Sequence, residues 1–236
     1  MKDEDHRKVA RFYDEVYYRN ATVNTHRSRH LMKLADRLRL VPGQKVLDVA
    51  CGAGDWLEIA ASKGATISGI DISKRAIGIC RQRLPEGEFY VGPAETLPFP
   101  DQQFDLITCL GSLEHFLDQP GALKEMARVA KPDARILILV PNAGFLTYRL
   151  RLYGGTHQQA VRETIRTLSE WQQMFSGAGL EIVDRWKDMH VLSRSWIIRP
   201  PWYLIPLRFI QALALAVWPL GWQYQVHHIC RVSKPA

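Results

Sequence analysis

Between residues 45 and 141, short apolar runs alternate with stretches of helical spacing, and this alternation restricts the fold more than any other feature. The runs are rich in Val, Ile, Leu and Phe and are bounded by Gly or Pro, as strands are. Strands that alternate with helices pair in parallel, and runs that are apolar throughout are buried on both faces. The chain is therefore predicted to form an open α/β sandwich. The predicted strands are Lys45–Ala50, Ala65–Asp71, Phe89–Gly92, Phe104–Leu110 and Arg135–Pro141, and the predicted helices are Trp56–Ser62, Lys74–Leu84 and Pro120–Ala130.

The flanks of this pattern differ from its centre. Before the first strand, Leu31, Leu34, Ala35 and Leu38 follow helical spacing and predict an amphipathic leader. After Pro141 we expect a helix around residues 169–176, a strand at 180–186, an aromatic and apolar insertion, and a closing strand at 226–232. We expect one domain with two appendages. Its parts are a helical lid (1–43), a core (44–188), the insertion (189–225), and the closing strand with the tail (226–236).

Composition and charge narrow the class of protein. With 236 residues, 47% hydrophobic and 23% charged, the chain is globular. Residues 1–8 are charged, which predicts no secretory signal and a cytoplasmic location, and the four scattered cysteines predict reduced thiols and no metal site. The net charge of the chain is +7. Residues 189–236 contain five basic residues and no Asp or Glu, so residues 1–188 carry only +2. Because that excess lies in a Trp-rich apolar tail, nucleic acid is not the expected partner.

The strand that runs into a glycine turn at Val46–Trp56 is the strongest local motif. Ligands of open α/β sheets bind where strands end, and Gly52 and Gly54 would let a ligand approach the backbone. Asp71 ends the next strand, nineteen positions after Gly52, where a carboxylate can bind both hydroxyls of a ribose. Leu57 takes the place of the third glycine of a dinucleotide site, and Asp48 suits a cationic ligand without phosphate. The motif predicts an adenosine-type cofactor; a turn that serves only packing is the alternative.

In these residues the chain resembles the class I S-adenosylmethionine-dependent methyltransferases, of the small-molecule type often labelled type 11. The likeness covers about residues 44–142. The motifs that carry it are the glycine turn, Gly69-Ile70-Asp71-Ile72-Ser73, Ala94-Glu95-Thr96-Leu97-Pro98-Phe99, Phe104-Asp105-Leu106-Ile107, Leu113-Glu114-His115-Phe116 and residues 123–142. The resemblance implies a Rossmann-like, open, mostly parallel seven-stranded sheet with helices on both faces. It also implies S-adenosylmethionine as cofactor and leaves the acceptor unspecified.

The resemblance also implies roles for individual residues. It places Asp48, Ala50, Gly52 and Gly54 around the methionine half of the cofactor, Asp71 on its ribose, Ile72 beside the adenine, Ala94 and Glu95 near the adenine edge, and Leu110 and Gly111 near the methyl group. Two positions depart from the family pattern. Ala50 replaces its usual first glycine, and Pro93 stands where many members have an acid that binds the adenine amino group. Glu95 is a candidate substitute for that acid.

Catalysis and closure have weaker signals. His115 follows the strand nearest the methyl group and is the best candidate for a base toward a hydroxyl acceptor, although a histidine that only bonds the backbone fits equally. Related enzymes place an aromatic run over the cofactor as a lid, for which Tyr13 and Tyr18 are the candidates. Packing of the leader onto the core is the alternative for these rings.

The insertion leaves three interpretations open. Arg208, Pro206 and Pro219 interrupt its apolar run, and a spanning segment would separate the closing strand from the sheet, so we expect no transmembrane helix. Residues 190–225 could instead contact a membrane surface, cap the substrate site or form packed helices. The expected function is methyl transfer by direct displacement to a small apolar or lipid-like acceptor. An RNA or protein methyltransferase and a non-catalytic, membrane-docked cofactor-binding protein are the alternatives.

Overall fold

The structure is a computed structural model that describes residues 2–21, 28–149, 163–189, 197–198 and 200–233. The strands are β1 (Lys45–Val49), β2 (Thr66–Asp71), β3 (Glu88–Val91), β4 (Phe104–Leu110), β5 (Ala130–Pro141), β6 (Leu180–Lys187) and β7 (Gln225–Val232). The helices are α1 (Lys2–Phe12), α2 (Arg29–Leu38), α3 (Asp55–Ser62), α4 (Lys74–Arg83), α5 (Gln119–Val129), α6 (Leu146–Arg149), α7 (Leu168–Gly177) and α9 (Ile205–Val217). Single turns lie at η1 (Tyr13–Tyr17), η2 (Leu113–His115), η4 (Trp202–Leu204) and η5 (Leu220–Trp222).

The strands form one sheet in the order β3-β2-β1-β4-β5-β7-β6. Strands β3, β2, β1, β4 and β5 pair in parallel, whereas β7 is antiparallel to both β5 and β6. The predicted open, mostly parallel seven-stranded sheet is thus confirmed, with one reversed strand. The closing strand inserts between β5 and β6, so the last strand in the sequence is not the edge of the sheet.

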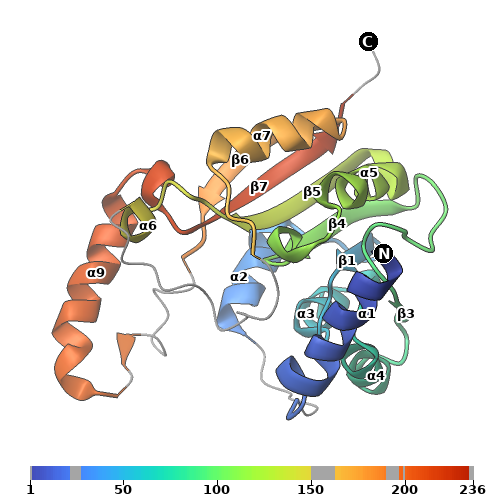
Figure 1. Cartoon of the computed structure of the whole chain (residues 1–236), viewed down its shortest axis with the longest axis horizontal. Coiled ribbons are helices and arrows are strands. Elements are labelled where there is room, and N and C mark those ends of the chain that lie inside the picture. Colours follow the sequence, from blue (N-terminus) through green and yellow to red (C-terminus); the bar gives the residue numbers. More distant parts are fainter. Residues whose placement is uncertain (1, 22–27, 150–162, 190–196, 199, 234–236) are drawn as a thin grey trace.

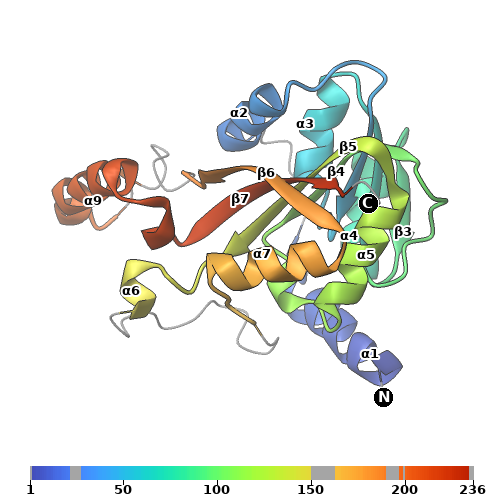
Figure 2. The same cartoon turned by 90° about the horizontal axis from the view of Figure 1, so that it is seen from above.

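Helices cover both faces of the sheet (Figure 2). On one face, α2, α3 and α4 pack on a core that includes Leu38, Trp56 and Ile77. On the other face, α5 and α7 pack on a second core, in which Leu123 and Trp171 are fully buried. The central strands lie between these two layers, which explains why every residue of β1 after Lys45 is buried.

The helices begin at residues that satisfy their free backbone N–H groups. The side chains of Ser28, Ser73 and Asp118 accept hydrogen bonds from the first turns of α2, α4 and α5. Helix α7 begins with a capping box between Thr167 and Glu170. The caps of α4, α5 and α7 place these helix starts within one residue of the predicted positions.

Strand β5 is longer than the sequence predicts. It begins at Ala130, directly after α5, instead of at Arg135. Pro132 and Asp133, which strands usually exclude, lie in this added part, and the pairing between β4 and β5 shifts register between Phe104 and Leu106. An irregular strand edge of this kind carries no hydrophobic signal.

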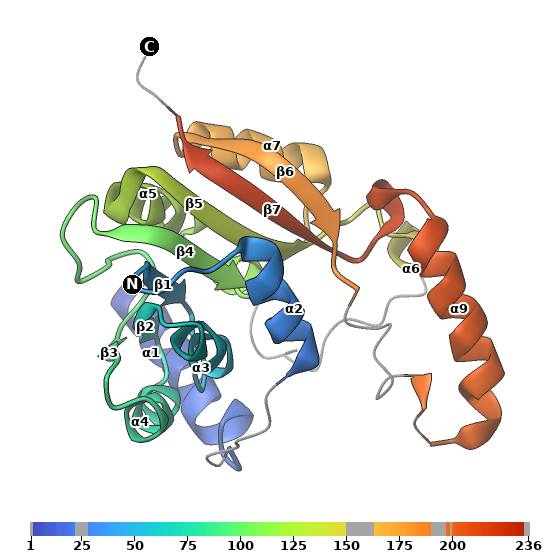
Figure 3. The same cartoon turned by 180° about the vertical axis from the view of Figure 1, so that it is seen from behind.

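The insertion extends away from the sheet. Helix α9 stands at the end of the molecule opposite α1 and α4 (Figures 1 and 3). Residues 190–196 and 199 of the insertion, with Trp196 among them, lie outside the described residues. Within the part of the chain that the structure describes, no helix has both the length and the apolar character needed to cross a bilayer.

Candidate active site

A cavity of about 390 Å³ lies where β1, β2 and β4 end, between the sheet and the N-terminal leader. The site residues predicted from the sequence, Gly54 excepted, all line it. They are Tyr13, Tyr18, Asp48, Ala50, Gly52, Asp71, Ile72, Ala94, Glu95, Leu110, Gly111 and His115. The topology brings these distant positions together because parallel strands carry their following loops to the same sheet edge.

Gly54 does not line the cavity. It caps the N-terminus of α3 at φ +83°, and a Cβ at this position would lie 3.0 Å from Cys80 Sγ and 3.3 Å from Leu84 Cδ1. This glycine therefore lets α3 pack closely against α4 and shapes the turn from behind. Its predicted place beside a ligand rested on the glycine spacing, which does not distinguish the two sides of a turn.

The turn after β1 is built on left-handed backbone conformations. Gly52 has φ +54°, and a Cβ there would lie only 2.7 Å from the Tyr18 hydroxyl. Ala50 has φ +60°, a left-handed conformation that is unfavourable for any residue with a Cβ atom. The replacement of glycine by alanine at position 50 therefore leaves the turn intact but strained.

Asp71 connects the turn to the end of β2. Its Oδ2 accepts a hydrogen bond of 2.9 Å from the Gly52 N–H, and its Oδ1 accepts one of 2.8 Å from the Ser73 N–H. Burial raises the pKa of this carboxyl, and the two backbone bonds oppose that shift. A carboxylate offers about four acceptor positions, so this fixed side chain retains acceptor capacity toward the cavity.

Asp48 lies on β1 beneath the turn and is only 4% exposed. Thr108 Oγ1, on the neighbouring strand, donates a hydrogen bond of 2.6 Å to Asp48 Oδ1. Burial raises the pKa of Asp48 to about 7, more than the bond from Thr108 lowers it. A cation in the cavity would favour the ionised form of this group.

The leader covers the cavity. Helix α1 continues into the π-helical turn η1, and π-helical turns are frequent at functional sites. Burial, followed by the charge of Asp71, raises the pKa values of Tyr13 and Tyr18, so both hydroxyls stay protonated. Asp14 Oδ1 anchors this segment at the start of α4, where it accepts hydrogen bonds from Ser73 Oγ at 2.5 Å and from the Arg75 N–H at 3.1 Å.

The edge of the cavity near β3 carries Pro93 and Glu95. Glu95 Oε1 accepts a hydrogen bond of 3.0 Å from the Asp118 N–H, and Glu95 Oε2 lies 3.5 Å from His6 Nε2 on α1. The Glu95 carboxylate thus lines the cavity but already has partners on both oxygens. His6 also lines the cavity and was not singled out from the sequence.

The end of β4 forms the opposite wall. Gly111 has φ +69°, and a Cβ there would meet Gln225 Nε2 at 3.6 Å. His115 ends the turn η2, is 9% exposed and lines the cavity. His115 therefore lines the same cavity as Asp48 and Asp71.

Glu114 is a further titratable group near this wall that sequence reasoning passed over. It is 3% exposed, and burial raises its pKa to about 8. Its charge also contributes to the raised pKa of Tyr13, which places it near the leader. An acid next to a candidate base in the sequence resembles any ordinary polar residue, so only its burial reveals it.

Comparison with known proteins finds methyltransferases among the relatives of this chain. Residues 47–138 match the family described as a methyltransferase domain. An uncharacterized methyltransferase of Bacillus subtilis, YcgJ, is 35% identical over 66% of this chain and 64% of its own length. A ubiquinone biosynthesis O-methyltransferase of Azoarcus sp. is 34% identical over 60% of this chain and 66% of its own length. The chain therefore spans slightly less than two thirds of each of these relatives.

Solved structures share the fold over almost the whole chain. The [4+2]-cyclase SpnF has a TM-score of 0.66 and 20% identity, and the alignment covers 98% of this chain and 97% of that one. A similarity at this identity concerns architecture, and SpnF is named for an activity other than methyl transfer. The residues of the cavity must therefore carry the functional argument.

Proposed function

Because the chain belongs to the class I S-adenosylmethionine-dependent methyltransferases, we propose that it transfers a methyl group to a small, apolar or lipid-like acceptor. The observation that carries this proposal is the fixed Asp71 carboxylate, held by Gly52 and Ser73 at the wall of the cavity. Ubiquinone biosynthesis and demethylmenaquinone methyltransferases among the relatives favour a quinone precursor as the acceptor class.

The cavity fits S-adenosylmethionine. Its volume of about 390 Å³ lies in the usual range for small-molecule sites of roughly 300–1,000 Å³. Asp71 would accept the ribose hydroxyls, Asp48 would face the positively charged methionine half, and Gly52 allows the Tyr18 hydroxyl to approach the turn closely. Ile72 and Ala94 would flank the adenine, with Glu95 at its edge in competition with His6. Bound S-adenosylmethionine supplies an electrophilic methyl group on a sulfonium sulfur.

The protein's part in the reaction is mainly to position the reactants, since well-oriented neighbours can supply roughly 7–11 kcal/mol of a barrier. Leu110 and Gly111 would shape the wall beside the transferred methyl group, and Tyr13 and Tyr18 would exclude water from above. His115 would take the proton of an acceptor hydroxyl as the new carbon–oxygen bond forms.

A methyl-transfer assay tests the function. The full chain is incubated with radiolabelled S-adenosylmethionine and, separately, with short-chain demethylated quinols, bulk tRNA and a protein extract. We expect label in the extractable quinol fraction. The substitution His115→Gln should reduce the turnover number more than it changes KM. Label only in tRNA or protein would support the other acceptor classes, and no label in any fraction would support the non-catalytic interpretation.

The apolar surface of α9 favours contact with a lipid surface. Arg208, Ala212 and Leu215 are the buried residues among the described positions of the helix. Leu207, Phe209, Ile210, Leu213 and Val217 are exposed, Val217 to 84%, and Trp202 and Tyr203 extend this surface beyond the helix start. Lys187 Nζ fixes the other end of α9 through hydrogen bonds to the carbonyls of residues 215, 216 and 218.

An anionic membrane would meet no acidic side chain of the segment that carries α9. No Asp or Glu occurs from Met189 to the C-terminus, so no carboxylate opposes a negatively charged headgroup there. At 13 residues the helix would be about 20 Å long, shorter than the roughly 30 Å core of a bilayer, so it would lie in the interface. A lipid-like acceptor dissolved in the same membrane would then be close to the site.

Vesicle sedimentation tests this surface. Wild-type chain should pellet with phosphatidylglycerol vesicles, and a Leu213→Asp/Val217→Asp variant should remain in the supernatant. Val41→Asp, at a valine outside α9 that is as exposed as Leu213, serves as the control. Equal pelleting of all three proteins would exclude α9 as the contact surface.

A further inference from the structure

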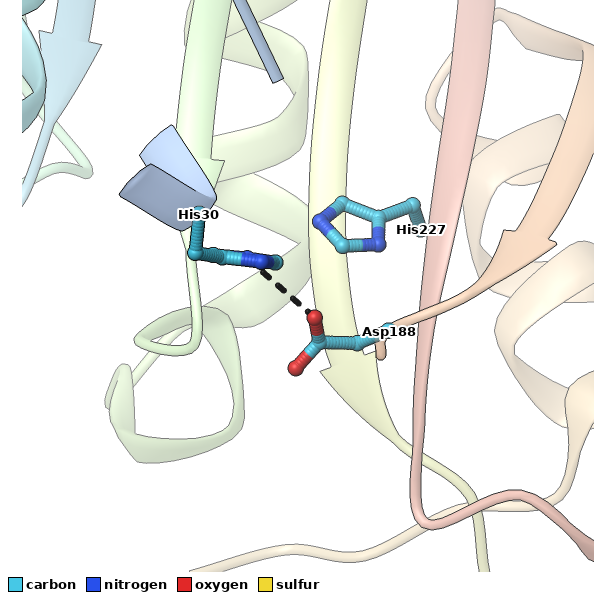
Figure 4. Close-up of side chains that lie close together, drawn as sticks. All are labelled: His30, Asp188 and His227. Carbon is cyan, nitrogen blue, oxygen red and sulfur yellow. Dashed lines mark ion pairs between the residues drawn. The ribbon is translucent and has the colours of Figure 1, made fainter. Parts of the chain in front are cut away.

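Two histidines and an aspartate from distant parts of the sequence meet beside α2. His30 is the second residue of α2, Asp188 directly follows β6, and His227 lies on β7. Each offers one ligand atom, and these three atoms lie within 4.8 Å of one another. Figure 4 shows the carboxylate of Asp188 directed at the His30 ring, with Nε2 and Oδ1 3.2 Å apart, and the His227 ring beside both.

Burial makes this cluster unusual. Asp188 is 3% exposed and His227 is 1% exposed, whereas the His30 side chain is about one-third exposed. Taking a carboxylate out of water is costly unless positive charge compensates it. A cation held by all three side chains would provide that compensation, and the partial exposure of His30 gives an ion a route from solvent.

Neighbouring groups hold the cluster in place. The Asp188 N–H donates to the Gln225 carbonyl at 3.0 Å, and Gln223 Nε2 donates to the Asp188 carbonyl at 2.7 Å. The His227 ring stacks on Trp186 at 5.0 Å with an interplanar angle of 9°, and the Arg37 guanidinium lies 4.0 Å from that indole. Such supporting contacts are what orient the ligands of metal sites.

We propose that His30, Asp188 and His227 bind one divalent transition-metal ion of the zinc type. Two imidazoles and one carboxylate suit zinc and its neighbours, whereas magnesium and calcium prefer oxygen ligands throughout. In a tetrahedral site, two ligand atoms about 2.0–2.1 Å from the ion lie roughly 3.4 Å apart, so a pair 4.8 Å apart would have to close by about 1.4 Å, shared between two side chains. Three protein ligands leave a further coordination position open.

The proposed site neighbours the cavity. Leu110, Leu139, His227 and Trp186 pair across β4, β5, β7 and β6, so His227 lies two strands, or roughly 10 Å, from the cavity wall at Leu110. Leu31, the residue after His30, also lines the cavity. Metal binding by these residues does not depend on the proposed methyl transfer and can be tested without S-adenosylmethionine.

Metal titration of the full, untagged chain tests the proposal. After treatment with EDTA and gel filtration, Zn²⁺ should bind at one ion per chain by calorimetry, Co²⁺ should give a visible d–d spectrum, and Mg²⁺ should give no heat. His30→Gln and Asp188→Asn should each weaken Zn²⁺ binding by at least about 10–100-fold. His30→Gln alters a partly exposed position on a helix. The test therefore remains valid even if Asp188→Asn, at a buried position, fails to fold.

His228→Gln is the matched control. His228 is the next residue on β7, and its ring lies against Phe175 in the other core. This variant should bind Zn²⁺ as the wild type does. The absence of one-to-one Zn²⁺ or Co²⁺ binding by the wild type, or equal affinities in the wild type and His30→Gln, would overturn the proposal.

Discussion

Thr108 Oγ1 donates a hydrogen bond of 2.6 Å to Asp48 Oδ1 across the paired strands β4 and β1. The bond stabilises the ionised carboxylate, but burial outweighs it and leaves the Asp48 pKa at about 7. A bound cation would lower this pKa, so binding near neutral pH would release a proton. The protonation state of one buried side chain thereby becomes coupled to cofactor affinity.

The first prediction concerns the pH dependence of binding. Affinity for S-adenosylmethionine should rise about tenfold between pH 6 and pH 8, as the ionised fraction of Asp48 increases. Thr108→Val should shift this rise to higher pH because it removes the bond that favours the charge. Asp48→Asn should bind more weakly and lose the dependence. Calorimetry at three pH values measures all three proteins, and identical pH profiles would contradict the role of Asp48.

Glu114 gives a prediction about stability. Its folded pKa of about 8 lies above the ordinary glutamate value of 4.5, so the folded state retains a proton that the unfolded state has lost. Its contribution to stability is complete below about pH 4.5 and declines as the pH rises through 8.

Glu114→Gln should remove this decline. The unfolding free energy of the variant minus that of the wild type should be larger at pH 8 than at pH 5, by on the order of 1–3 kcal/mol. Urea midpoints at both pH values provide the measurement, with the exposed Glu181→Gln as control. A constant difference between Glu114→Gln and wild type at the two pH values would show that Glu114 titrates normally.

Ala50 gives a prediction about backbone strain. At φ +60° an alanine is strained by about 1–2 kcal/mol, and glycine relieves this at an entropic cost of about 0.4–1 kcal/mol. Ala50→Gly should therefore raise the unfolding free energy by up to about 1 kcal/mol, or a few degrees in melting temperature. The reverse change at Gly43, which has φ +77° and open space around it, should be destabilising. A lower melting temperature for Ala50→Gly would contradict the strained turn.

Asp14 gives a prediction about closure of the leader. Hydrogen bonds to a charged group contribute roughly 1.5–3 kcal/mol, and Asp14 makes two at the start of α4. Asp14→Ala should weaken binding of S-adenosylhomocysteine by about 10–100-fold and speed proteolysis of residues 2–20. The neighbouring exposed Glu15→Ala should change neither. Stopped-flow dissociation rates would record the effect, and equal rates would mean that the leader does not act as a lid.

The core of the fold could be predicted from the sequence because its signals are local. The apolar run 104–110 is bounded by residues that end strands, and β4 spans this same run, Phe104–Leu110. The Gly52 turn and Asp71 could be paired in advance because parallel strands end at a common edge, and the structure joins them by a hydrogen bond. Helix α1 had no comparable signal, since it is strongly polar and is positioned by contacts such as His6 with Glu95.

The remaining features depend on contacts between distant residues. Gly54 faces α4 because of how α3 packs, which the glycine spacing cannot indicate. Asp188 lies more than a hundred positions after His30 in the sequence, so His30, Asp188 and His227 do not follow the short spacing of a metal-binding motif. Glu114 has a raised pKa only because the fold buries it.

We expect the turn after β1 and the carboxylate of Asp71 to hold the adenosine part of S-adenosylmethionine. Isothermal titration of the ligand into the wild type, Asp71→Asn, Gly52→Val and the exposed control Asp36→Asn tests it most directly. We predict one-to-one binding by the wild type and Asp36→Asn, and a loss of at least about 100-fold in the other two. Unchanged affinity in both Asp71→Asn and Gly52→Val, with folded proteins by circular dichroism, would mean that these residues do not hold the ligand.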